Sequence, residues 1–366
     1  MFLLKIRTRQ FPIWGRFSVG DSPFGDGSLL GKGQFSIVQK GLNNMNIIFM
    51  GTPDFAAESL KAIIEKGHNI MAVVTNPDRP KGRGMKMIAT PVKEVAIEKN
   101  IPVYQPLKVK ENEEFVEELK CLNPDVICVV AYGKILPKAI LDIPKYGCIN
   151  VHASLLPKYR GAAPIQWAVL NGDKTTGVTT MYMDIGMDTG DMILKEEVQI
   201  GEDETTGELW DRLSIIGGNL LVKTLDEIEN GTVKRIPQGE NFTVAPMLSK
   251  DMAKIDWQSK NAREIKNLVR GLNPIMGAYA MFNGKKIKFW KVRAFDEGAE
   301  LKEALGEFDF SGKKAGEVIL ADSKKGLFIK TIDGVISVEE IQGENAKRMN
   351  VGDFLRGFSI GDGCFC

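Results

Sequence analysis

From residue 45 onward, short apolar runs alternate with segments in which apolar residues recur every three or four positions. The runs predict buried β-strands, and the spaced segments predict amphipathic helices. Strands are expected at residues 46–51, 69–75, 101–106, 124–133, 147–152 and 175–184. Helices are expected at residues 53–67, 90–100, 111–123, 162–172 and 203–230, with Thr52 as the N-cap of the first. Because several strands are apolar throughout and alternate with helices, we expect an open, mostly parallel, doubly wound (Rossmann-like) α/β sheet.

The pattern changes after residue 230. Residues 231–254 are polar and rich in turn residues, which is the composition of a linker. A helix is predicted at 261–272, and the apolar positions that follow form short runs separated by glycine and aspartate turns. These strands are expected at residues 277–283, 285–295, 316–322, 326–333 and 334–342. Short strands at this spacing predict a small C-terminal β-barrel of the OB-like kind.

The chain therefore divides into an extension, a larger domain, a linker and a smaller domain. We place these parts at residues 1–44, 45–230, 231–250 and 251–366. The extension is rich in glycine, carries more basic than acidic residues and has no helical period. We interpret it as sequence upstream of a true start at Met45. An organelle-type leader and a disordered extension are the alternatives.

Composition narrows the class of protein. The chain of 366 residues is 43% apolar and 26% charged, as soluble globular proteins are. Its net charge of +1 means that a polyanionic partner would have to bind local basic patches. The five cysteines form no C-x-x-C pair and no zinc spacing with the two histidines, which favours a reducing, cytoplasmic setting. No apolar run is long enough to span a membrane, and the first strand–turn, "GTPDF", lacks the spacing of dinucleotide-binding sites.

Polar side chains of three kinds follow predicted strand ends. Ligands of open α/β sheets bind beyond the carboxyl ends of the strands, and His152 ends one such strand, two residues after Asn150. An imidazole can move protons and an asparagine amide can donate to a developing oxyanion, while an aspartate orients the ring. The next strand leads into three aspartates, Asp184, Asp188 and Asp191. Spacing does not choose among them, and a structural loop histidine with solvent-facing aspartates is the alternative.

Five segments together carry a resemblance to a known family. They are "GTPDFAAESL", "NPDRPKGRGMKM", "VVAYGKILP", "NVHASLLPKYRGAAPIQWA" and "MDIGMDTGDM", in that order along the chain. From Met45 to about Phe354 the sequence resembles the formyltetrahydrofolate-dependent formyltransferases. The "PDRPKGRG" loop narrows the resemblance to the family members that act on methionyl-tRNA.

The resemblance implies an activity and its residues. A formyl group would pass from 10-formyltetrahydrofolate to the α-amine of methionyl initiator tRNA, by direct attack of the amine and through a tetrahedral oxyanion. The implied catalytic trio is Asn150, His152 and Asp188. No metal and no covalent enzyme intermediate are implied, and the chain is expected to be a monomer. The implied folate-contacting loop consists of Ser154, Leu155, Leu156 and Pro157, and "VAYGKILP" is expected to form the opposite wall.

Two basic regions are candidates for tRNA contact. Residues 76–91 have no apolar period and are interrupted by prolines and glycines, which predicts a surface loop without regular structure. Such a loop is usually only solvated, but the resemblance implies insertion against the acceptor stem, with Arg83 probing its end. The loop's cations are Arg79, Lys81, Arg83 and Lys86.

The barrel supplies the second basic region. The resemblance implies a positive surface that binds tRNA phosphates without reading much sequence. Its candidate cations are Lys285, Lys286 and Lys288. The alternation of this strand breaks at Phe289 and Trp290, so the pattern does not say which lysines share a face. A plain solvated barrel is the alternative.

Competing functions remain open at this point. A formyltransferase acting on a nucleotide amino sugar would use the same trio, and the basic loop and barrel argue against it. A non-catalytic RNA-binding protein with a relic fold would have no chemical reason to keep Asn150, His152 and Asp188. The tail after the barrel has no assigned role, and we expect Cys364 and Cys366 to be exposed and not catalytic.

Overall fold

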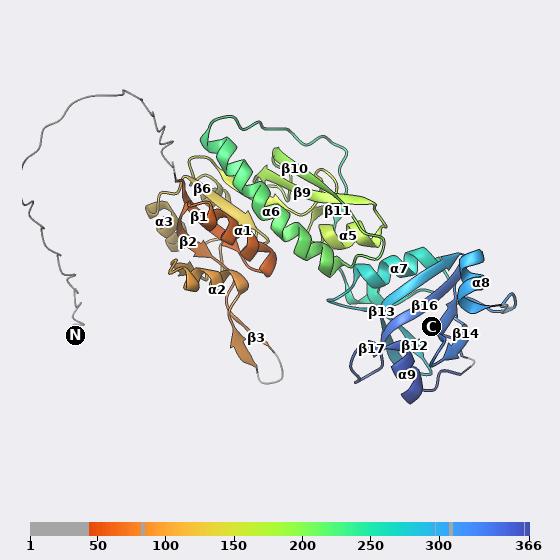
Figure 1. Ribbon diagram of the computed structural model, residues 1–366. Helices are drawn as coiled ribbons and strands as arrows, with labels where there is room; N and C mark the ends of the chain where they lie inside the picture. The colour runs from red at the N-terminus through yellow and green to blue at the C-terminus, as the bar shows by residue number, and fades with distance from the viewer. Residues whose placement is uncertain (1–43, 82–84, 297, 307–309, 362) are drawn as a thin grey trace, which may run out of the picture. The chain divides into compact units, whose positions relative to one another are not determined.

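The computed structural model describes residues 44–81, 85–296, 298–306, 310–361 and 363–366. The interpretation of residues 1–43 therefore lies outside the described residues, and so does the role expected for Arg83. The described chain contains an α/β region followed by an antiparallel β region (Figure 1).

The α/β region is built on one seven-stranded sheet with strand order β10-β9-β7-β6-β1-β2-β5. Its strands are β1 (Asn46–Gly51), β2 (Asn69–Val74), β5 (Val103–Tyr104), β6 (Val126–Val130), β7 (Cys148–His152), β9 (Thr175–Tyr182) and β10 (Met192–Gln199). The five strands from β7 to β5 run parallel, and β9 and β10 are antiparallel additions at one edge. The mostly parallel sheet confirms the predicted fold class. Strand β10 escaped prediction because polar residues alternate along its exposed face.

Helices cover both faces of this sheet, as a doubly wound fold requires (Figure 1). They are α1 (Asp54–Glu65), α2 (Pro91–Glu98), α3 (Glu113–Cys121), α4 (Lys138–Leu141), α5 (Pro164–Leu170) and α6 (Thr206–Glu229). Apolar side chains of α1, α2, α5 and α6 share one core, and those of α3 and α4 form a core on the opposite face. The N-cap prediction at Thr52 is wrong: the cap position is Pro53, and the Thr52 hydroxyl donates to the Tyr132 carbonyl instead.

The second region is a six-stranded antiparallel sheet with helices beside it. Five strands follow the order β12-β13-β16-β15-β14, and β17 pairs with β16. The strands are β12 (Ala278–Phe282), β13 (Lys285–Asp296), β14 (Val318–Asp322), β15 (Gly326–Lys330), β16 (Gly334–Gln342) and β17 (Met349–Asn350). The helices are the short 3-10 turn η1 (Lys250–Ala253), α7 (Ala262–Gly271), α8 (Ala299–Leu305) and α9 (Val351–Gly357).

A β-bulge explains the broken alternation of β13. The pairing with β16 shifts between Phe289 and Lys291 and again between Lys291 and Val292, so an extra residue on β13, Trp290, is followed by an extra residue on β16, Glu339. An extra residue on one strand reverses the inside–outside alternation beyond it. Phe289 and Val292 can therefore both face the core, although they are three residues apart.

The C-terminal tail contributes a core residue that sequence analysis missed. The ring of Phe365 is 1% exposed and packs among the barrel's aromatic side chains. Its centroid lies 4.7 Å from that of Phe282, 5.5 Å from that of Phe289 and 6.1 Å from that of Trp257. One phenylalanine between two cysteines has no periodicity, so no pattern could have revealed its burial.

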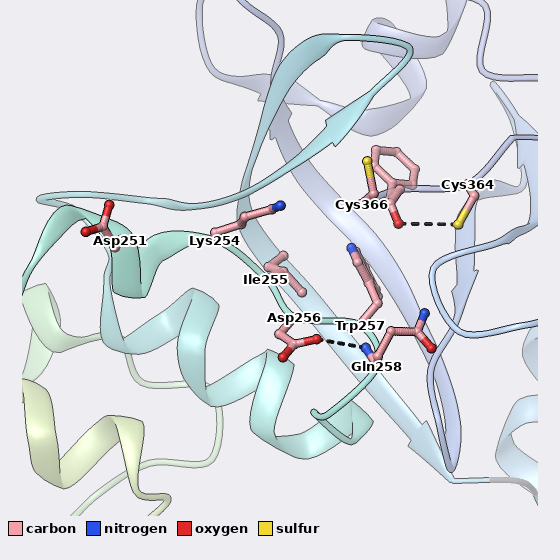
Figure 2. Close-up of a pocket in the computed structure, with 9 residues that line it drawn as sticks. Asp251, Lys254, Ile255, Asp256, Trp257, Gln258, Cys364 and Cys366 are labelled. Carbon is pink, nitrogen blue, oxygen red and sulfur yellow. Dashed lines mark hydrogen bonds between the residues drawn. The ribbon is translucent and has the colours of Figure 1, made fainter.

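The tail also closes the antiparallel sheet into a barrel. The Gly363 carbonyl accepts from the Val318 amide in β14, and Cys366 exchanges two backbone hydrogen bonds with Met281 in β12. Because β12 and β14 are the two edges of the sheet, these bonds cover part of each edge. Cys364 and Cys366 are exposed, as expected, at the rim of a cavity of about 500 Å³ (Figure 2).

Candidate active site

Strand β7 presents Asn150 and His152 on the same face of the sheet. Alternate residues of a strand point to opposite faces, and Ile149 and Val151 lie in the core beneath α1 and α6. Asn150 and His152 therefore face the other way, at the carboxyl end of β7. The side-chain amide of Asn150 makes no hydrogen bond with any described residue, so its two N–H donors are available to a substrate.

The imidazole of His152 is held from two sides. It is 6% exposed, and its Nε2 lies 2.9 Å from the Tyr159 carbonyl oxygen. A carbonyl can only accept, so Nε2 carries a proton and donates to it. Nδ1 then faces the Asp188 carboxylate, with 3.6 Å between Nδ1 and Oδ2. With Nε2 bonded to the Tyr159 carbonyl, Nδ1 is the ring nitrogen left facing Asp188.

Of the three candidate aspartates, Asp188 lies beside His152. Its Oδ2 also accepts from the Gly161 backbone amide at 2.8 Å. The side chain of Asp184 instead accepts from the next backbone amide in its own exposed loop. Asp191 contacts Arg235, with 3.9 Å between the carboxylate and Nε. The structure thus brings Asp188, and neither of its neighbours, to the histidine.

The loop from Ser154 to Pro157 is fixed by a buried hydroxyl. Thr179, on β9, donates from Oγ1 to the Ser154 carbonyl at 2.7 Å and accepts from the Leu156 amide at 3.1 Å. Lys195 on β10 donates to the Leu156 carbonyl at 2.5 Å, and burial lowers the pKa of this lysine. Leu156 packs beneath the loop in a small apolar cluster, whereas Leu155 is partly exposed. Both backbone and apolar groups of this loop therefore stand at the edge of the site.

The turn after β6 belongs to the segment that is expected to form the wall opposite the folate-contacting loop. The Asn76 side chain donates to the Tyr132 carbonyl at 2.9 Å and to the Thr52 hydroxyl at 3.0 Å. The ends of β1, β2 and β6 are thereby joined. The Tyr132 hydroxyl is buried without a hydrogen-bond partner among the described residues, and burial raises its pKa to about 12. An orphaned hydroxyl at a strand end is a group that a polar ligand could satisfy.

The basic loop is a β-hairpin and not the irregular loop that the sequence predicted. Strand β3 (Arg79–Lys81) pairs with β4 (Lys86–Ile88), with Arg79 opposite Ile88. The short strands escaped prediction because only cross-strand pairing stabilises so polar a segment. Arg79 and Lys86 are exposed on this hairpin, and Arg83 lies outside the described residues.

A charged cluster anchors the root of the hairpin. Lys93 on α2 donates to Asp78 at 2.7 Å and to Gln105 at 2.8 Å. The Gln105 amide donates in turn to Asp78 and to the Asn76 carbonyl, each at 2.8 Å. The hydrogen bonds from Lys93 and Gln105 lower the pKa of Asp78. Asp78, the acid nearest the hairpin in sequence, is therefore bound to Lys93, and it makes no ion pair with Arg79 or Lys86, the hairpin cations whose side chains are described.

The three candidate lysines of the barrel differ in the face of the strand on which they lie and in their contacts. Lys286 and Lys288 lie two residues apart on the outer face of β13, and Lys285 is on the other side of the strand's start. The Lys286 ammonium lies 3.9 Å from the centroid of the Tyr279 ring. Lys288 donates to the Met276 carbonyl at 2.8 Å, so its ammonium already has a partner.

The linker is a part of the site that sequence reasoning missed. Its strand β11 (Val244–Ala245) pairs with β8 (Arg160–Gly161), directly after the folate-loop candidate. The Gln238 side chain donates to the carbonyls of Asp188 and Gly190, each at 2.8 Å. The composition predicted only a linker, and the fold shows that one of its polar side chains binds the loop that carries Asp188.

Other features of the described residues bear on the class of site. The cavity of about 500 Å³ lies beside the tail, and Asn150, His152 and Asp188 are not among the residues that line it. Within the ranges that the structure describes, no cluster of histidine, cysteine and carboxylate side chains could hold a metal ion. No described helix has the length and apolar character needed to cross a membrane.

Comparison with known proteins assigns the class. Residues 45–225 match the family model described as formyl transferase, and residues 247–359 match the model for the formyl transferase C-terminal domain. The α/β region and the barrel are thus the two domains of a formyltransferase.

Relatives with about half of their residues identical to this chain identify the family. The methionyl-tRNA formyltransferase of Clostridioides difficile (strain 630) is 53% identical over 320 residues, which are 87% of this chain and 99% of the relative. That of Alkaliphilus oremlandii (strain OhILAs) is 51% identical and covers 87% and 98%. The chain belongs to the methionyl-tRNA formyltransferase family and is an enzyme.

Solved structures with lower identity share the fold. A sugar 3N-formyltransferase, WlaRD, aligns with a TM-score of 0.57 at 22% identity, over 83% of this chain and 99% of that one. HypX from Aquifex aeolicus, in complex with tetrahydrofolic acid, aligns with a TM-score of 0.57 at 16% identity, over 88% of this chain and 50% of that one.

Proposed function

We propose that this enzyme transfers the formyl group of 10-formyltetrahydrofolate to the α-amine of methionyl initiator tRNA, giving N-formylmethionyl-tRNA for translation initiation. The observation that carries the proposal is the position of Asn150, His152 and Asp188 at the carboxyl end of β7, within a chain of this family. The Asn150 amide and the His152–Asp188 pair supply a hydrogen-bond donor and a proton-exchanging group side by side.

The proposed reaction needs no covalent bond to the enzyme. The neutral amine attacks the formyl carbon, and the carbonyl electron pair moves to oxygen to form a tetrahedral oxyanion. The Asn150 amide and protonated His152 donate to this oxyanion, each contributing about 3 kcal/mol to the transition state. Collapse restores the carbonyl and breaks the bond to N10, which takes up a proton as the attacking amine loses one. Asp188 holds the ring in place and helps to pass protons from the attacking amine towards N10.

The substrates are proposed to meet at this strand end from two sides. The backbone of Ser154 to Pro157 would face the polar edge of the pterin, and Leu155 the apolar slot. The hairpin cations Arg79 and Lys86, with Lys81 and Arg83, would contact the acceptor stem. Lys285, Lys286 and Lys288 would contact phosphates, with Lys286 contributing more than Lys288 because the latter already bonds to a carbonyl.

The test is formylation of methionyl-tRNA by 10-formyltetrahydrofolate, with a nucleotide amino sugar as the rival acceptor. We expect formylation of the tRNA alone and a loss of at least about 100-fold in kcat for His152→Ala. Formylation of the sugar in preference to the tRNA would support the alternative acceptor. Undiminished activity of His152→Ala would refute the trio.

A second experiment separates the two substrates. Arg83→Leu should greatly lower activity on methionyl-tRNA while the affinity for folate stays unchanged. Affinity for tRNA should fall steeply with salt, because the contacts are to phosphates. Equal loss of folate binding, or an affinity insensitive to salt, would contradict the assignment of the basic regions.

A further inference from the structure

The Asp188 backbone adopts a conformation that needs outside support. Its φ is +53°, in the left-handed region that residues other than glycine rarely occupy. Such conformations persist where neighbouring groups hold them in place. The Gly161 amide binds the Asp188 carboxylate, but it does not hold the backbone of the loop. The group that does so comes from the linker.

Gln238 binds this loop on both sides of Thr189. Its Nε2 donates to the Asp188 carbonyl and to the Gly190 carbonyl, each at 2.8 Å. Its Oε1 accepts from Arg160 Nε at 2.9 Å. Arginine has no acceptor, so this bond fixes which end of the amide is oxygen and directs both amide hydrogens to the loop.

The linker holds Gln238 in place. The backbone of Ile236 exchanges two hydrogen bonds with Met192 in β10, and β11 pairs with β8 a few residues further on. Gln238 is half-buried, whereas its neighbours Pro237 and Gly239 are exposed. A solvated linker would not bury one amide and use two of its hydrogen bonds on the 188–190 loop and a third on Arg160 of β8.

We propose that Gln238 is a positioning residue for formyl transfer, acting through the backbone of Asp188. The inference rests on the proposed function of His152 and Asp188. Gln238 touches neither the imidazole nor the carboxylate. It sets the 188–190 backbone, and thereby the 3.6 Å separation between Asp188 Oδ2 and His152 Nδ1.

The effect should fall on the chemical step and not on substrate binding. At Gly190 the loop lies closely against the backbone of Tyr182, where an added Cβ would lie 2.0 Å from the carbonyl oxygen, so this end of the loop has no room to move towards Tyr182. Loss of Gln238 would therefore displace the Asp188 end of the loop. A displacement of about 1 Å at a catalytic group can lower a rate by about 100-fold.

The test compares Gln238→Ala and Gln238→Glu with Glu240→Ala, an exposed residue of the same linker. Glutamate keeps the volume of glutamine but places an acceptor against two carbonyls. We expect both Gln238 variants to lose about 10- to 100-fold in kcat, with KM for folate and tRNA nearly unchanged. Glu240→Ala should behave like the unaltered enzyme. A Gln238→Glu variant with unaltered kcat, or a loss confined to KM, would overturn the inference.

A double-mutant cycle shows whether Gln238 acts through Asp188. In an Asp188→Asn background, measured under single-turnover conditions, Gln238→Ala should cost little more. A full additional loss in that background would overturn the inference and leave the trio standing. Undiminished kcat of Asp188→Asn alone would refute the role of Asp188 and, with it, that of Gln238.

Discussion

The hydroxyl of Thr179 is the support of the proposed folate loop, and Thr179→Val is the sharpest way to test it. Valine keeps the shape of threonine and removes only the hydrogen bonds. The hydroxyl is fully buried, donates to the Ser154 carbonyl and accepts from the Leu156 amide. Both of those backbone groups belong to the loop and would lose this partner.

The magnitude follows from the two groups left unpaired. A buried donor or acceptor without a partner costs about 1–3 kcal/mol, so the two groups together should lower the free energy of unfolding of Thr179→Val by about 2–6 kcal/mol. Domains are commonly stable by about 5–15 kcal/mol, and one stable by more than about 6 kcal/mol remains folded. Part of this lost free energy will favour conformations in which the loop of Ser154 to Pro157 has left its folded position. If about 1.4 kcal/mol does so, the Kd for folate rises about tenfold.

The neighbouring residue provides a matched control. Thr180 is equally buried, accepts from the Leu194 amide and contacts the Thr224 hydroxyl, on the opposite face of β9. Thr180→Val should therefore cost similar stability without weakening folate binding. The assay is denaturant unfolding together with calorimetric titration of 5-formyltetrahydrofolate as a stable analogue. Equal weakening of folate binding in both variants, or in neither, would refute the role of the Thr179 hydroxyl.

Three further predictions follow from other contacts. Lys93→Ala should raise the pKa of Asp78 towards its ordinary value, and NMR titration of the Asp78 carboxyl would follow this change. Because the pKa of Asp78 is lowered in the folded state, the Lys93–Asp78 pair stabilises the fold fully at pH values above the ordinary pKa. This stabilisation is lost as the pH falls through the folded-state pKa. Tyr132→Phe should raise the free energy of unfolding, measured in denaturant, by about 1 kcal/mol, since the hydroxyl is buried without a partner among the described residues. A lower free energy of unfolding would show that a bound water satisfies the hydroxyl. Phe365→Ala should cost about 3–5 kcal/mol, measured as unfolding of the barrel, and a change below about 1 kcal/mol would show that the tail does not close it.

Much of the fold could be predicted from local pattern. Strands β1 and β16 have the predicted bounds, and α6 lies within the predicted helix, because each is long or apolar enough to show its period. The hairpin at 79–88 and strand β10 were missed. Their residues are polar, and pairing with a neighbouring strand stabilises them more than their own sequence does.

Part of the candidate site could also be predicted from local pattern. Asn150 and His152 stand two residues apart at the end of an apolar run, and the alternation of a strand is enough to predict that they share one face. The choice of Asp188 over Asp184 and Asp191 rested on a family resemblance, since all three follow the same strand. The distance to His152 agrees with that choice.

By itself, the sequence determined the elements, the order of the two domains and the family, because hydrophobic period and local motifs act over a few neighbouring residues. Only the tertiary structure decided which distant groups meet. Gln238 reaches the Asp188 loop from 50 residues away, and Phe365 fills the barrel from the end of the chain. Neither contact leaves a local signal, since each depends on where the fold brings the chain back.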